Sequence, residues 1–216
     1  MDGPVYSLTV YDGSLVAGGS FSRASDTPVG NIARWDGSSW HDLGEWLYPF
    51  HPVGVHEDKL IAYNGSVIRR WDGSDWQTIG QTNDVYSVET FGFYQGDLLV
   101  AGWFRRIDDT QVNGLARWDG TQWHPVGIER NGGYYYGLAV YRDDLVVAGT
   151  FTTAGDEGVK GIARWDGSAW HKFGRGMNNW VTTFTEYKGD LVAAGEFTSA
   201  GDVLGMGRLG MNSAPA

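Results

Sequence analysis

A short motif recurs along the chain and strongly limits the folds that the chain can adopt. Arg-Trp-Asp-Gly occurs at residues 34–37, 70–73, 117–120 and 164–167, and a second tryptophan follows each copy, at positions 40, 76, 123 and 170. A leucine-led apolar run precedes each copy and appears a fifth time at residues 191–194. Five repeats of about 44 residues are therefore present, and periods of this length are typical of propellers and solenoids.

Each repeat contains the signals of four short strands. Tight turns such as Asp12-Gly13, Gln95-Gly96 and Lys188-Gly189 join the first two strands, and such turns between apolar runs indicate hairpins. A longer loop leads to a third strand that ends in Arg-Trp, and an Asp-Gly turn leads to the fourth. Glycine makes up 33 of 216 residues, which excludes a helical protein because helices tolerate internal glycine poorly. Repeated sets of four strands predict β-propeller blades.

The predicted fold is all-β, a five-bladed β-propeller in a single domain over residues 1–216, with the last blade lacking its outer strand. The repeats cover about residues 1–44, 45–80, 81–127, 128–174 and 175–216. The fifth repeat ends in a decayed third strand at residues 205–209 and has no second tryptophan strand. Because an unpaired strand edge invites pairing with another chain, we expect the edge of the fifth blade to support self-association.

The repeats resemble the W-D-G…W-x-x-L-G repeats of bacterial secreted β-propellers, and they are similar to those of the fungal cortical polarity marker family. They are more loosely similar to kelch and galactose-oxidase-type blades. The resemblance covers nearly the whole chain and implies propeller architecture and an extracellular or cell-surface location. It implies little about activity, because such blades support unrelated functions.

Composition excludes several classes of partner and site. The net charge is −10, so we expect neither a nucleic acid nor an anionic membrane as partner. No apolar run approaches the roughly 20 residues of a membrane span, so we expect no membrane insertion. There is no cysteine, which excludes disulfides, zinc–thiolate sites and a thiol nucleophile. Residues 1–4 have no feature of a signal peptide.

Several polar residues recur with the repeat and are interpreted as scaffold. We expect an aspartate in the long loop to order a turn or to pair with the third-strand arginine, and the arginines to pair between blades. The eight tryptophans of the motif are expected to pack in the core. Three histidines lie on separate outer strands, too far apart for one metal ion, so we expect neither a metal nor a cofactor. These residues are Asp26, Asp109, Asp156 and Asp202; Arg34, Arg70, Arg117, Arg164 and Arg208; and His41, His124 and His171.

The connections that break the repeat supply the candidate ligand-binding residues. They join the fourth strand of one repeat to the first strand of the next, and they combine aromatic residues with Asn, Asp and Gly. Such a composition is typical of a rim that binds a protein or a glycan, and it also suits a hydrophobic plug in the channel mouth. The candidates are Tyr6, Tyr48, His51, Tyr86, Glu89, Tyr134, Tyr136 and Trp180.

The sequence favours a non-catalytic binding or interaction module that holds a protein or a glycan on its variable-loop face. Two alternatives stay open. A glycoside-active enzyme would be centred on Glu89, the one carboxylate in its column of first-strand residues. A structural subunit of a larger surface assembly would explain the incomplete fifth repeat. No residue is assigned as catalytic, because the sequence holds no Ser-His-Asp spacing, phosphate loop or metal cage.

Overall fold

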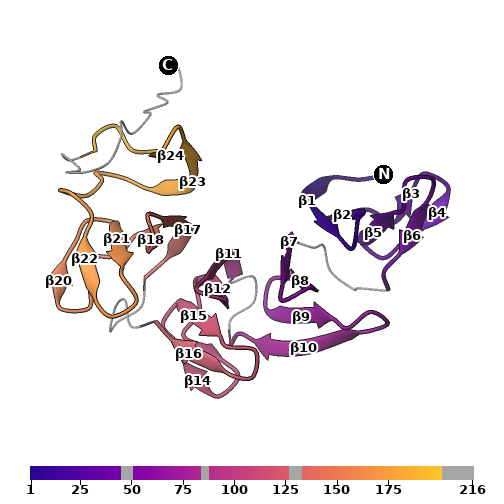
Figure 1. Ribbon diagram of the computed structural model, residues 1–216, viewed down its shortest axis with the longest axis horizontal. Helices are drawn as coiled ribbons and strands as arrows, with labels where there is room; N and C mark the ends of the chain where they lie inside the picture. Colours follow the sequence, from indigo (N-terminus) through magenta and orange to yellow (C-terminus); the bar gives the residue numbers. More distant parts are fainter. Residues whose placement is uncertain (45–50, 84–87, 127–132, 201–216) are drawn as a thin grey trace. The chain divides into compact units, whose positions relative to one another are not determined.

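The structure is a computed structural model that describes residues 1–44, 51–83, 88–126 and 133–200, with the side chains of residues 51–53 left aside. Every regular element in these ranges is a β-strand (Figure 1), which confirms the all-β prediction. The described part of the chain contains no helix that could cross a membrane. The chain divides into two compact units, Met1–Ser87 and Val88–Ala216, and each is described by itself.

The first unit contains two four-stranded antiparallel sheets, called sheets I and II. In each sheet, the four long strands lie side by side in the order in which they occur in the chain, as in a propeller blade. A small hairpin, β3 (Arg23–Ala24) and β4 (Thr27–Pro28), lies in the long loop of sheet I. Sheet I consists of β1 (Val5–Tyr11), β2 (Ser14–Gly19), β5 (Ile32–Trp35) and β6 (Trp40–Asp42); sheet II consists of β7 (His51–His56), β8 (Lys59–Tyr63), β9 (Val67–Trp71) and β10 (Trp76–Gln81).

The second unit repeats this plan in sheets III and IV and adds a two-stranded sheet, β23 (Val181–Tyr187) and β24 (Asp190–Gly195). The predicted third strand at 205–209 lies outside the described residues, so the five-blade count, the missing outer strand and the single domain stay predictions. Sheet III consists of β11 (Val88–Tyr94), β12 (Asp97–Gly102), β15 (Leu115–Trp118) and β16 (Trp123–Pro125), and sheet IV of β17 (Tyr135–Tyr141), β18 (Asp144–Gly149), β21 (Ile162–Trp165) and β22 (Trp170–Lys172). Their long loops contain the hairpins β13 (Arg106–Ile107)–β14 (Thr110–Gln111) and β19 (Thr153–Ala154)–β20 (Glu157–Gly158).

Two kinds of turn give the sheets their regular register. The tight turns between first and second strands have positive φ at both central residues, as at Asp12 (47°) and Gly13 (69°). This backbone follows the right-handed twist of the flanking strands. At the Asp-Gly turns, the side chain of the aspartate accepts main-chain hydrogen bonds: Asp36 Oδ1 lies 2.8 Å from the nitrogen of Ser38 and 2.9 Å from that of Ser39. The repeated motif therefore encodes the turn in its own side chain.

Neighbouring sheets of the second unit pack large residues on small ones. Leu138 of sheet IV lies over Gly92 of sheet III, and Phe184 of β23 lies over Gly137 of sheet IV. Leu138 also packs against the buried cluster that contains Leu99, Tyr135 and Val147 from sheets III and IV. This packing of large side chains over glycines fills the space between sheets at high density.

The tryptophans are less buried than predicted. Trp123 and Trp170 are buried, whereas the other six tryptophans of the motif are half-buried. In each sheet the two indoles contact one another at centroid distances of 5.3–5.5 Å. The first indole of each pair thus packs against the second at the edge of the core, and only part of its surface leaves water.

The repeated arginines pair differently from the prediction. Arg117 on β15 contacts Asp97 on β12 at 2.5 Å, and Arg164 on β21 contacts Asp144 on β18 at 2.5 Å. Each partner lies within the same sheet, at the start of the second strand, because the antiparallel register brings these two positions together. The expectation of blade-to-blade pairs and of pairing with the loop aspartates is wrong for these two arginines.

Candidate functional site

The first strand of sheet IV contains a β-bulge at a predicted site residue. Tyr135 pairs with Gly149 and Gly137 pairs with Ala148, so Tyr136 is an extra residue in the ladder. The same irregularity in β1, β11 and β23 places Tyr6, Glu89 and Thr182 at the register shifts of these strands. A β-bulge redirects the side chain of the extra residue and is common beside functional sites. Tyr6, Glu89 and Tyr136 occupy equivalent positions in their repeats, and all three are therefore bulge residues.

The main chain before β1, β17 and β23 is held by a hydrogen bond from the residue after the second strand. The carbonyl of Tyr134 accepts a hydrogen bond from the main-chain nitrogen of Thr150 at 2.8 Å, and that of Trp180 accepts one from Glu196 at 2.9 Å. A Cβ atom on Gly195 would collide with the carbonyl of Trp180. This close approach requires glycine, and it fixes the main chain that carries the aromatic side chains.

Four aromatic rings follow one another across the second unit, and we call Trp103, Tyr134, Tyr136 and Trp180 the aromatic row. The first two rings stack with centroids 5.2 Å apart and planes 15° apart, and Tyr134 and Tyr136 stack at 6.4 Å and 22°. Tyr136 and Trp180 are tilted by 44° at 5.9 Å. The rings come from the end of β12, the start of β17 and the residue before β23, so three successive sheets contribute.

The aromatic row is open to solvent. Trp103 is 55% exposed, Trp180 44% and Tyr134 42%, whereas large aromatic side chains are mostly buried on average. Neighbouring exposed apolar side chains of this kind mark interaction sites. The row thus offers a continuous, exposed aromatic surface whose rings contact one another.

Sequence reasoning missed Trp103. It follows β12 directly, and the corresponding positions in three other repeats hold Ser20, Thr150 and Glu196. The corresponding residues are polar, so a tryptophan at this position departs from the repeat. This departure could have marked Trp103 as a candidate site residue. Its ring partner Tyr134 is distant in sequence, so only the structure shows that the two residues form one surface.

Glu89 and Tyr136 bring polar chemistry to the middle of the row. Burial raises the pKa of the Tyr136 hydroxyl, and the negative charge of Glu89 raises that pKa further. The Tyr136 hydroxyl therefore stays protonated at neutral pH and can donate a hydrogen bond. Glu89 is exposed, so its carboxylate is open to solvent.

The remaining predicted candidates lie in the first unit or outside the described residues. Tyr6 is 49% exposed and belongs to the first unit. His51 is the first residue of β7, and its side chain lies outside the description. Tyr48 and Tyr86 lie outside the described residues. The structure thus brings together four of the eight predicted residues, namely Glu89, Tyr134, Tyr136 and Trp180.

The repeated histidines stabilise turns. His124 Nε2 lies 2.6 Å from Asp119 Oδ2, within the Asp-Gly turn of its own sheet. The same 2.6 Å pair joins His41 to Asp36 and His171 to Asp166. Among the described residues, no group of three or more His, Cys, Asp or Glu side chains could hold a metal ion.

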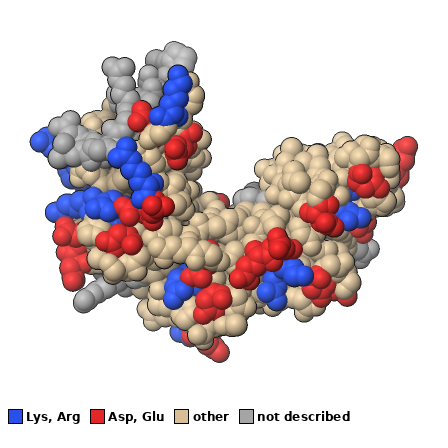
Figure 2. Space-filling model, in the orientation of Figure 1, with Lys and Arg blue, Asp and Glu red and all other residues tan. Residues whose placement is uncertain are grey.

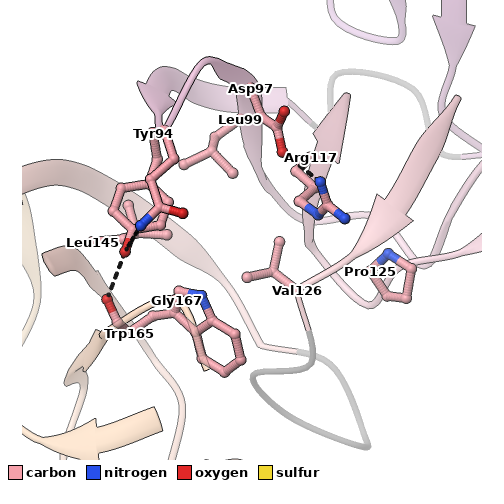
Figure 3. Close-up of a pocket in the computed structure, with 10 residues that line it drawn as sticks. Tyr94, Asp97, Leu99, Arg117, Pro125, Val126, Leu145, Trp165 and Gly167 are labelled. Atoms are coloured by element: carbon pink, nitrogen blue, oxygen red, sulfur yellow. Dashed lines mark hydrogen bonds and ion pairs between the residues drawn. The ribbon is translucent and has the colours of Figure 1, made fainter. Parts of the chain in front are cut away.

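A cavity of about 540 Å³ lies between sheets III and IV (Figure 3). Leu99, Val126 and Leu145 supply apolar walls, and Gln95 and the Arg117–Asp97 pair supply polar groups. The Tyr94 hydroxyl donates a hydrogen bond to the carbonyl of Trp165 across this space at 3.4 Å. Sheet IV holds the same ion pair as Arg164–Asp144, so the charged pair of the cavity belongs to the repeated scaffold.

Charged side chains of both signs are interspersed on the surface. In the face drawn in Figure 2, Lys and Arg side chains of the described residues lie among Asp and Glu side chains and form no continuous basic band. A nucleic-acid-binding face would concentrate positive charge.

Comparisons with known proteins support the fold. No protein-family model matches the chain, and no curated protein matches it. Two crystal structures of an extracellular domain from B. thetaiotaomicron are similar to it, one described as part of a one-component system and the other as part of a hybrid two-component system.

The first of these structures has a TM-score of 0.63 at 10% sequence identity over 88% of this chain, and the second has a TM-score of 0.55 at 7% identity over 87%. The chain spans 25% of the length of each. At this identity the likeness concerns the fold, and it agrees with the all-β architecture of repeated antiparallel sheets.

Proposed function

We propose that this chain is a non-catalytic ligand-binding module that holds an extracellular protein or a glycan on the aromatic row. The observation that carries the proposal is the contiguity of Trp103, Tyr134, Tyr136 and Trp180, which form one exposed surface from three sheets. Tryptophan and tyrosine contribute large binding energies when a ligand covers them, because they bury much area at a small cost in side-chain entropy.

The exposure of the row supports binding over the alternative of a hydrophobic plug. A plug would place the rings in contact with protein on most sides, whereas three of the four rings are at least 42% exposed. The bulges and the main-chain hydrogen bonds hold the rings in place before a ligand arrives, which lowers the entropy cost of binding. An extracellular or cell-surface location is part of this proposal, and the likeness to extracellular domains supports it.

The test is a ligand screen with matched variants. The wild-type protein is immobilised and exposed to a glycan array and to a panel of extracellular proteins, and each hit is repeated with the double variant Trp103→Ala/Trp180→Ala. Tyr187→Ala is the control, because Tyr187 is 62% exposed at the far end of β23 from Trp180. We expect the double variant to lose binding and the control to keep it. Equal binding by all three proteins would refute the proposal.

A further inference from the structure

Two adjoining cavities lie where the chain leaves β22 of sheet IV for β23. Their volumes are about 370 and 360 Å³, and Lys160, Arg175 and Gly176 line both of them. Pockets that bind small molecules have volumes of about 300–1,000 Å³. We call the two cavities together the basic pocket, and all of its described lining residues belong to the second unit.

The charge of the basic pocket is opposite to that of the whole protein. The chain has a net charge of −10, whereas Lys160, Lys172 and Arg175 line the pocket and no described lining residue is acidic. Glu157 pairs with Lys172 at 3.2 Å. Lys160 and Arg175 are exposed, and neither has an ion pair within the part of the chain that the structure describes. Their two charges can therefore attract an anion.

The three basic residues also depart from the repeat. Lys160 lies two residues before the third strand of its repeat, Lys172 follows the histidine of the fourth strand, and Arg175 follows the apolar-Gly pair. The corresponding residues of two other repeats are neutral or acidic, namely Gly30, Asp42 and Glu45 in the first repeat and Asn113, Pro125 and Ile128 in the third. Because four-stranded sheets form in those repeats as well, the scaffold does not need these positive charges.

Hydrogen bonds hold the walls of the basic pocket in place. The main-chain nitrogen of Met177 donates to the carbonyl of Lys160 over 2.9 Å, and the main-chain nitrogen of Ser199 donates to Asn178 Oδ1 over 2.8 Å. A Cβ atom on Gly176 would lie only 2.4 Å from the Cβ atom of Lys160. This close approach requires glycine. The pocket is thus formed before a ligand arrives, which lowers the cost of binding.

The two cavities differ in the chemistry of their other walls. Asn178 and Ser199 line the first one, whereas Val159, Ile162 and Phe173 line the second. A guanidinium group binds a phosphate or a carboxylate through two parallel hydrogen bonds. A phosphate monoester has a charge of about −1.5 to −2 at pH 7, so it matches two cations better than a singly charged carboxylate does. The apolar walls suit an apolar group attached to that phosphate.

We propose that the basic pocket binds a small phosphate monoester. The phosphate group lies between Lys160 and Arg175, and the apolar part of the ligand lies against Val159 and Phe173. This site shares no residue with the aromatic row, so it is a second binding site of the protein. The net charge of the chain disfavours long polyanions, but charges farther away than about 8 Å are largely screened at physiological ionic strength, so the nearby cations dominate for a single phosphate group.

The experiment measures the affinity for phenyl phosphate by calorimetry in a buffer without phosphate. Three matched probes each lack one feature: inorganic phosphate has no apolar part, benzoate has a single negative charge, and phenol is neutral at pH 7. We expect phenyl phosphate to bind about tenfold more tightly than inorganic phosphate or benzoate, and phenol to bind more weakly than all three. The affinity should fall when the NaCl concentration is raised from about 25 mM to about 150 mM, because the ion pairs are exposed.

Variants test the two cations separately from the general charge of the protein. Lys160→Gln and Arg175→Gln should each weaken the binding of phenyl phosphate by about fivefold or more, and the double variant should weaken it further. Lys188→Gln is the control, because it removes the same charge from an exposed side chain in the turn after β23, away from the pocket. It should bind as the wild type does. Circular dichroism and melting curves confirm that each variant is folded.

Several results would overturn the inference. These are a lack of phenyl phosphate binding at about 10 mM, unchanged binding by the double variant Lys160→Gln/Arg175→Gln, and an equal loss of affinity in Lys188→Gln. Tighter binding of benzoate than of phenyl phosphate would overturn the assignment to a phosphate group. Trp103→Ala should keep the affinity for phenyl phosphate, so this site and the proposed function of the aromatic row can fail independently.

Discussion

The indole nitrogen of Trp170 in sheet IV donates a hydrogen bond to the main-chain carbonyl of Val126, at the end of sheet III, over 3.0 Å. Trp76 of sheet II makes the corresponding bond to Leu43, at the end of sheet I, over 2.7 Å. The second tryptophan of one repeat thus bonds the main chain three residues after the second tryptophan of the preceding repeat. This bond joins consecutive repeats, which explains why the second tryptophan recurs in each of them.

Trp170→Phe should destabilise the second unit by about 1–3 kcal/mol, because it leaves the buried carbonyl of Val126 without its donor. Trp170→Ala should cost more, about 3–5 kcal/mol, because it also opens a cavity. Denaturant unfolding followed by circular dichroism measures both values. Equal stability of Trp170→Phe and the wild type would show that the hydrogen bond contributes nothing.

Gly137→Ala should destabilise the protein by about 1–3 kcal/mol. A Cβ atom at residue 137 would lie 3.0 Å from Cε2 of Phe184, so the aromatic ring must move. Gly92→Ala is the matched control, since its Cβ atom would meet Leu138 at an ordinary 3.6 Å. It should be neutral or slightly stabilising. Adding Phe184→Leu to Gly137→Ala should restore part of the loss, and failure to do so would contradict the packing of these two sheets.

Stability should fall in acid because of the Asp-Gly turns. The main-chain N–H of Asp75 and then that of Ser74 lower the pKa of Asp72 to about 2, below the value of about 3.9 in an unfolded chain. A folded pKa below the unfolded one stabilises the native state above about pH 4, and this contribution is lost as the pH falls towards 2. Asp36, Asp119 and Asp166 have lowered pKa values from similar hydrogen bonds.

Asp72→Asn should flatten the acid limb of the melting temperature between pH 4 and pH 2, because the amide has no carboxylate to protonate. Asp75→Asn is the control in the same turn, since residue 75 contributes its main-chain nitrogen to Asp72. Thermal melts of the three proteins across this pH range test the prediction. If the melting temperature of Asp72→Asn fell between pH 4 and pH 2 as much as that of the wild type, groups other than Asp72 would cause the loss of stability in acid.

Truncation of two adjacent tyrosines should have very different effects on the stability of the protein. Tyr135 is fully buried and contacts Phe151, so Tyr135→Ala should cost about 3–5 kcal/mol. Tyr134 is exposed, so Tyr134→Ala should change stability by less than about 1 kcal/mol and should reduce ligand binding. A large loss of stability in Tyr134→Ala would favour the hydrophobic plug over a binding surface.

The wild-type protein should not cleave a glycan, since we propose a non-catalytic binding module. Chromatography of a tetrasaccharide incubated with the protein measures any cleavage. Product that forms with the wild type and disappears with Glu89→Gln would establish the glycoside-active alternative. Retention of the tetrasaccharide by Glu89→Gln would show that the variant still binds.

Much of the local structure follows from short stretches of sequence. The Asp-Gly turns need only the aspartate and the two or three residues after it, because its side chain accepts their main-chain hydrogen bonds. The tight turn at Asp12-Gly13 and the apolar runs beside it are equally local. Repetition of these signals made the strand order of sheets I–IV predictable.

The contacts between repeats required the tertiary structure. The pairing of Arg117 with Asp97 depends on the register of two strands, and the sequence offered other carboxylates at plausible positions. The stacking of Trp103 on Tyr134 joins two sheets, because each ring follows a separate strand whose end the fold brings to the same place. The sequence determined by itself that the chain forms repeated β-sheets, since turns and strand periodicity are local. Which aromatic residues form one surface was decided only by the tertiary structure, because packing between sheets depends on residues far apart in the chain.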